Sequence, residues 1–148
     1  MDDLRDLYQQ LILDHNQNPQ NFREMIDATS KAEGHNPLCG DEITLFLQIE
    51  NEKIIDASFK GTGCAISKAS ASIMTTLIKD LTVNEAEILF EQFHKMITTG
   101  ETNGDMGKLM VLAGVYKFPA RVKCAVLSWH TMNNALLGNT ELTSTEIS

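Results

Sequence analysis

Three cysteines, Cys39, Cys64 and Cys124, are the residues of this sequence whose types are best suited to chemistry. Their number is odd and they lie far apart, which argues against a disulfide framework and favours reduced thiols. Separated reduced cysteines act as inert core residues, metal ligands or nucleophiles, and their neighbours decide between these roles. The role of each cysteine must therefore be inferred from the residues around it.

Asp41 follows Cys39 by two positions, with Gly40 between them. Both side chains can point to one side if Gly40 adopts a bend that other residues resist. Three thiolates and one carboxylate provide the four donors of a tetrahedral zinc site, and a sulfur-rich set selects zinc or an iron–sulfur cluster over calcium or magnesium. Spacing alone leaves ordinary buried core cysteines as an equally good interpretation, because the sequence has no CxxC pair.

The elements that must position these residues follow from hydrophobic patterning. Apolar residues recur with a helical period over 4–12, so we predict an N-terminal helix that ends in a loop at 16–21. Apolar residues alternate over 43–49 and 55–59, which predicts a β-hairpin. A third strand is expected at 28–34, because a hairpin alone is seldom stable.

Three more helices are predicted towards the C-terminus. The Ala- and Ser-rich stretch 65–78 follows a glycine turn, and Cys64 lies at its N-terminus. Thr82 and Glu85 form a capping-box pattern that opens a helix fading by residue 98. Pro119 suits the first turn of a last helix, and the glycine-bearing stretch 99–107 before it is expected to be a mobile surface excursion.

Length and composition predict one α+β domain over 1–148, a small antiparallel sheet covered by helices, with a frayed tail at 141–148. The net charge of -8, without a compensating basic cluster, argues against nucleic acid and anionic membrane surfaces as partners. No apolar run approaches the roughly 20 residues that span a bilayer, and the N-terminus is acidic where a secretory signal is basic. We expect a cytoplasmic protein.

The sequence around each cysteine is specific. The three motifs are HNPLCGD at 35–41, GTGCAIS at 61–67 and FPARVKCA at 118–125. Together they resemble the IscU/SufU family of iron–sulfur cluster assembly, also described as NifU N-terminal-like, and the resemblance covers nearly the whole chain. It implies a three-stranded antiparallel sheet with helices packed on it, a cysteine desulfurase partner and a metal site at one end. The implied ligands are Cys39, Asp41, Cys64 and Cys124.

Three departures from the IscU branch match the SufU branch. Lys123 stands where IscU proteins carry a histidine, the stretch between Cys64 and Cys124 is longer, and FPARVK replaces the LPPVK that a chaperone recognises. The SufU resemblance implies a zinc-dependent sulfurtransferase that accepts persulfide sulfur from a SufS-type cysteine desulfurase and passes it to downstream iron–sulfur assembly proteins. The alternatives are a scaffold for a transient iron–sulfur cluster and, as a third class, a structural zinc module.

The SufU resemblance assigns the mobile sulfur acceptor to Cys39, which lies on a predicted loop. Arg121 precedes Cys124 by three positions and shares its helix face, where a cation would offset the negative charge of the site. A solvated arginine is an equally good interpretation of this spacing, and the resemblance favours a catalytic role.

The remaining candidates are expected to be structural or exposed. None of the histidines has a recurrent metal-finger spacing, no base is expected beside the serines, and Trp129 fits the core. These histidines and serines are His15, His35, His94, His130, Ser67, Ser70 and Ser72.

Overall fold

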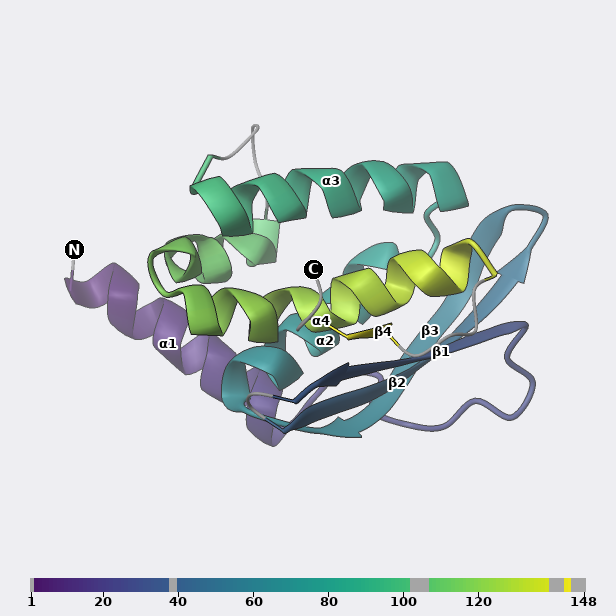
Figure 1. Ribbon diagram of the computed structural model, residues 1–148, viewed down its shortest axis with the longest axis horizontal. Coiled ribbons are helices and arrows are strands. Elements are labelled where there is room, and N and C mark those ends of the chain that lie inside the picture. The colour runs from purple at the N-terminus through teal and green to yellow at the C-terminus, as the bar shows by residue number, and fades with distance from the viewer. Residues whose placement is uncertain (1, 38–39, 102–106, 139–142, 145–148) are drawn as a thin grey trace.

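The computed structural model describes residues 2–37, 40–101, 107–138 and 143–144 of the chain (Figure 1). The elements follow in the order α1 (Asp2–Gln17), β1 (Ser30–Asn36), β2 (Asp41–Glu50), β3 (Lys53–Thr62), α2 (Ala65–Ile78), α3 (Val83–Thr99), η1 (Gly107–Lys117), α4 (Pro119–Leu136) and β4 (Thr143–Ser144). Among the described residues, no helix is long and apolar enough to cross a membrane.

The sheet has the strand order β3-β2-β1-β4. Strands β1, β2 and β3 are antiparallel neighbours, which confirms the three predicted strands, although β1 begins two residues later than expected. Asn51 and Glu52 both have positive φ in the turn between β2 and β3, as a tight hairpin turn requires. The pairing of Asn36 with Asp41 places the start of β2 beside the end of β1.

The short strand β4 was not predicted. We expected fraying from residue 141, but Thr143 and Ser144 pair in parallel with Gly34 and His35 of β1. Strand β1 would otherwise be an edge of the sheet with free backbone N–H and C=O groups, and these groups give the C-terminal segment a partner. Residues 139–142 and 145–148 of the predicted tail lie outside the described residues.

The helices form two layers on one face of the sheet (Figure 1). Helices α2 and α4 pack on the strands, and α3 lies on the far side of α4, where it contacts α4 and η1. Trp129 of α4 is fully buried and stacks on Phe93 of α3, with ring centroids 4.3 Å apart. Such a pair contributes about 1 kcal/mol beyond the area it buries. The predicted core role of Trp129 is confirmed.

The element η1 occupies part of the stretch in which no regular structure was predicted. Three of its four buried residues, Leu109, Leu112 and Val115, recur every three positions, the period of a 3₁₀ helix, and Val111 is the fourth. Gly104, in the predicted surface excursion, lies outside the described residues.

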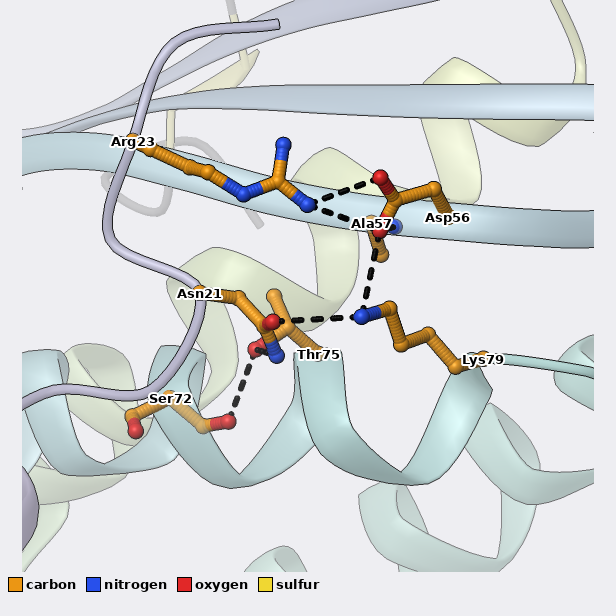
Figure 2. A network of polar contacts seen from close by, with 7 residues as sticks. All are labelled: Asn21, Arg23, Asp56, Ala57, Ser72, Thr75 and Lys79. Carbon is orange, nitrogen blue, oxygen red and sulfur yellow. Dashed lines mark hydrogen bonds and ion pairs between the residues drawn. The ribbon is translucent and has the colours of Figure 1, made fainter.

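A polar network fastens the segment after α1 to β3 and α2 (Figure 2). Arg23 donates to both carboxylate oxygens of Asp56, at 2.9 and 2.7 Å. Lys79 lies 3.2 Å from Asp56 Oδ1 and donates to Asn21 Oδ1 at 3.3 Å. Asn21 also donates to Thr75 of α2 at 3.2 Å. Segments more than 30 positions apart are thereby held side by side.

Ser72 has a base beside it, contrary to our expectation. Its hydroxyl lies 2.6 Å from Nδ1 of His15 and accepts a hydrogen bond from the backbone N–H of Gln20 at 2.7 Å. Ser72 is fully buried and His15 nearly so, and burial lowers the pKa of His15. A nucleophile must reach its substrate, so a serine buried this deeply is unsuited to that role. The His15–Ser72 pair instead joins α1 to α2, in keeping with the packing role expected for the serines.

Candidate metal centre

Three of the four predicted ligands converge at one end of the sheet. Asp41 begins β2, Cys64 is the N-cap residue of α2, and Cys124 lies in the second turn of α4. One donor atom from each residue lies within 4.8 Å of the other two. The fourth predicted ligand, Cys39, lies outside the described residues. The structure thus brings Asp41, Cys64 and Cys124 together at one end of the sheet, as the family resemblance implies.

Asp41 is fully buried and held by two donors. The backbone N–H of Cys64 donates to Oδ1 at 2.9 Å, and the amide of Asn36 donates to Oδ2 at 3.4 Å. Gly40 has φ of 70°, in the left-handed region, so the bend predicted between Cys39 and Asp41 begins at this glycine. Gly63 passes so close that a Cβ there would lie 2.6 Å from Asp41 Oδ1. The carboxylate is therefore fixed by its neighbours on both sides.

Cys64 is a half-buried thiol at the start of α2. A hydrogen bond from the Cys124 thiol is the largest influence and lowers the pKa of Cys64, whereas burial raises it. The backbone N–H of Ser67, which donates to Sγ at 3.4 Å, lowers this pKa further, and the negative charge of Asp41 raises it. The net result is a Cys64 pKa lowered to about 6. Cys64 is therefore mostly thiolate at neutral pH, the form that binds metals and attacks sulfur.

Cys124 is fully buried on the inner side of α4. Its sulfur lies 3.6 Å from the carbonyl oxygen of Ala120, and the Asn36 amide donates to this sulfur at 3.8 Å. Asn36 therefore contacts both Asp41 and Cys124, although we did not single it out from the sequence. Its place inside the HNPLCGD motif, five residues before Asp41, is the signal that could have found it.

The donor set suits a divalent cation. The ion pairs found within the described parts of the chain link Arg23, Lys79 and Lys95 to acidic partners, and none of them includes Asp41. A buried carboxylate next to a thiolate is costly without a compensating positive charge. Two sulfurs and one carboxylate oxygen select zinc or iron over calcium or magnesium. Zinc therefore fits the residues present, and Cys39 could supply the fourth donor.

Arg121 and Lys123 lie in the first turn and a half of α4. The Arg121 side chain is exposed, one helical turn before Cys124. Lys123 is half-buried and lines a hollow with Tyr116, Val126 and His130. None of His15, His35, His94 and His130 belongs to the donor cluster found among the described residues.

Comparison with known proteins places the chain in a family. The family described as NifU-like N terminal domain matches residues 7–125. The zinc-dependent sulfurtransferase SufU of Bacillus subtilis is 39% identical over 132 residues, which are 88% of this chain and 89% of SufU. The iron–sulfur cluster assembly scaffold protein IscU of Thermotoga maritima is 45% identical over 134 residues, which are 88% of this chain and 92% of that protein.

The fold agrees with these sequences. A crystal structure of a putative iron–sulfur cluster assembly scaffold protein for the SUF system, from Fervidobacterium islandicum, superimposes with a TM-score of 0.81. The two proteins are 34% identical, and the match covers 85% of this chain and 93% of the other. The resemblance predicted from the three cysteine motifs is thus confirmed by sequence and by fold. The chain belongs to the NifU-like N-terminal domain family, with SufU and IscU proteins among its relatives.

Proposed function

We propose that this protein is a cytoplasmic, zinc-dependent sulfur carrier that accepts persulfide sulfur from a SufS-type cysteine desulfurase for iron–sulfur cluster assembly. The observation that carries the proposal is the convergence of Asp41, Cys64 and Cys124 within 4.8 Å, with the pKa of Cys64 lowered to about 6. The name of the Bacillus subtilis relative, which covers nearly the same length, supports the same activity.

Zinc would be held by Cys39, Asp41, Cys64 and Cys124. When bound, it would keep the thiols deprotonated and supply the positive charge that the buried carboxylate lacks. The chain's own groups prepare the site before any ion arrives. Asn36 and the Cys64 N–H orient the Asp41 carboxylate, and the Ser67 N–H favours the thiolate of Cys64. Such supporting groups tune affinity by roughly 10- to 100-fold.

Cys39 is the proposed sulfur acceptor. Its thiolate would attack the outer sulfur of the desulfurase persulfide, forming a new S–S bond while the bond between that sulfur and the desulfurase cysteine breaks. The electron pair leaves with the desulfurase cysteine as a thiolate, so the exchange needs no outside oxidant or reductant. Cys124 is fully buried, and the half-buried Cys64 sulfur accepts the Ser67 N–H that caps α2, so the use of either cysteine as acceptor would disturb a helix.

Arg121 is proposed to assist at the surface of the site. Its exposed guanidinium, one turn from Cys124, is placed to offset the negative charge of an incoming persulfide. Replacing Arg121 by Gln should slow sulfur acceptance and leave zinc content unchanged. Replacing the exposed, equally charged Lys117 of η1 by Gln provides a matched control.

A second candidate function is a scaffold on which a transient iron–sulfur cluster is assembled and delivered. The scaffold name of the 45% identical Thermotoga maritima relative supports it, and thiolates with one carboxylate also suit iron. Metal content separates the two functions. Protein purified without oxygen should contain about one zinc per chain and no visible cluster absorbance, because four protein donors fill a tetrahedral shell. Stoichiometric iron with sulfide would favour the scaffold.

Mass spectrometry after reaction with desulfurase and cysteine tests the acceptor. One added sulfur should appear on the peptide that contains Cys39, and the Cys39→Ser variant should lose it while retaining some zinc. The Cys64→Ser and Cys124→Ser variants should instead lose zinc and activity together. Sulfur on the Cys64 or Cys124 peptide, or full desulfurase stimulation by Cys39→Ser, would refute the assignment of the acceptor.

A further inference from the structure

We propose that Asn36 is a positioning residue that joins Asp41 and Cys124 into one rigid half of the metal centre and draws electron density from the Cys124 sulfur. The inference rests on the proposed function, because it concerns the same centre, and it adds the residue that governs two of the ligands. Asn36 would touch neither the ion nor the transferred sulfur. Its influence would pass through its hydrogen bonds to the two ligands.

The ends of two strands bring Asn36 to these ligands. Buried residues alternate along β1, so the side chain of Asn36 points to the face of the sheet that α4 covers. Asn36 is the cross-strand partner of Asp41, whose side chain points to the same face. Pro37 follows Asn36 and favours extended backbone at the residue before it, which suits the last position of a strand. Both side chains thus meet Cys124 of α4.

The carboxamide of Asn36 can have only one orientation. Its NH₂ group donates to Asp41 Oδ2 at 3.4 Å and to Cys124 Sγ at 3.8 Å. A carboxylate and a thiolate offer only acceptors, so the amide nitrogen and not the amide oxygen must face them. The two N–H groups of one nitrogen therefore serve two anionic ligands that come from different elements.

The oxygen of the same carboxamide is unsatisfied. Asn36 Oδ1 is buried and has no hydrogen-bond partner among the described residues. Asn36, Asp41 and Cys124 all have exposed fractions of 0%. An unpaired buried acceptor costs stability, and an apolar side chain of similar size would avoid that cost. Stability alone therefore does not explain an asparagine at this position, whereas hydrogen bonding to two buried ligands does.

The hydrogen bond to Cys124 changes the electronic character of its sulfur. An N–H dipole that points at a thiolate stabilises the sulfur lone pairs, so the sulfur donates less electron density to a bound ion and is a weaker nucleophile. The centre therefore has a buried half, in which Asn36 holds Asp41 and Cys124, and a more accessible half that includes the half-buried Cys64. We expect Asp41 and Cys124 to stay on the ion while sulfur is accepted at the accessible half.

Cobalt substitution tests the inference with an absorption spectrum. The chain loaded with Co²⁺ should show a sulfur-to-cobalt charge-transfer band, and Asn36→Ala should move this band to lower energy, because the Cys124 sulfur becomes more electron-rich. Competition with a chromophoric chelator should show that Asn36→Ala lowers zinc affinity by about 10- to 100-fold. Leu45→Val is the matched control, because it also removes a small volume from the buried face of the same sheet but takes away no polar group. Its band and its zinc affinity should match the wild type.

A measurement on the unmodified chain avoids any folding defect of the variant. With ¹¹³Cd²⁺ at the centre, NMR should show scalar coupling between the metal and the side-chain amide protons of Asn36, transmitted through the N–H···S hydrogen bond. Asn21, whose amide donates to Thr75 at 3.2 Å, is the internal control and should show no such coupling.

The inference is wrong if Asn36 shows no coupling to the metal, or if Asn36→Ala keeps the wild-type band and the wild-type zinc affinity. A wild-type chain that shows no sulfur-to-cobalt band would instead overturn the metal centre itself, and with it the proposed function.

Discussion

Gly63→Ala should damage the metal centre without touching a ligand. A Cβ at this position would lie 2.6 Å from Asp41 Oδ1 and 3.2 Å from Asp41 Cγ. Closely packed atoms do not tolerate such contacts, so the carboxylate must move by about half an ångström. Because Asp41 is fully buried and accepts the Cys64 N–H at 2.9 Å, this movement strains or breaks that hydrogen bond.

The magnitude follows from the bond that is lost. A hydrogen bond to a charged group contributes roughly 1.5–3 kcal/mol, which corresponds to a loss of roughly 10- to 100-fold in zinc affinity. The fold should survive, since Gly63 is exposed and its backbone lies outside the left-handed region. The variant therefore shifts the Asp41 carboxylate while keeping it as a metal ligand.

Competition with a chromophoric chelator measures the zinc affinity of both proteins. Gly114→Ala is the matched control, because a Cβ at Gly114 meets no atom within 4 Å and its backbone is also outside the left-handed region. The control should bind zinc like the wild type. If Gly63→Ala binds zinc as tightly as Gly114→Ala, then the position of Asp41 does not govern the affinity and the proposed role of this carboxylate is wrong.

Four other predictions concern stability and protonation. Ser72→Ala should lower the free energy of unfolding, measured in urea, by about 2 kcal/mol, because it leaves the buried His15 ring without its partner. Ser128→Ala should be neutral or stabilising, since the buried Ser128 hydroxyl has no hydrogen-bond partner among the described residues. In metal-free protein, the rate of Cys64 alkylation should rise with a pH midpoint near 6, below the ordinary thiol pKa of 9.0, and Cys124→Ala should raise this midpoint. Because folding lowers the pKa of Cys64, the stability that its thiolate contributes is lost as pH falls from 9 towards 6. Removing zinc with a chelator should lower the melting temperature measured by calorimetry, and an unchanged value would contradict a metal centre coupled to folding.

Local chemistry made several elements predictable from the sequence. Thr82 and Glu85 form the capping box that their spacing predicts, with hydrogen bonds of 3.1 and 2.9 Å between side chain and backbone. Pro119 occupies the first turn of α4, where its missing N–H costs nothing. The alternating strands also form the predicted hairpin, because burial of one sheet face imposes that alternation.

The missed features depend on contacts between distant segments. The His15–Ser72 contact spans 57 positions, and no local pattern connects a helix histidine with that particular serine. Strand β4 exists because β1 offers an unpaired edge, which is a property of the assembled sheet. Asn36 gains its role only when α4 brings Cys124 against the end of β1. The cysteine motifs indicated which residues would meet, but the supporting contacts required the structure.

The wide sequence separation of the metal centre has a kinetic consequence. The Asn36–Cys124 contact spans 88 positions, and the ligands come from β2, α2 and α4, so the centre is complete only when these elements have packed. Contacts between such distant segments carry a large loop-closure entropy, so we expect them to form late in folding. Interactions that form after the transition state slow unfolding and leave the folding rate nearly unchanged. An ion bound here would therefore leave the folding rate close to that of the metal-free chain. By slowing unfolding, it would lengthen the lifetime of the native state.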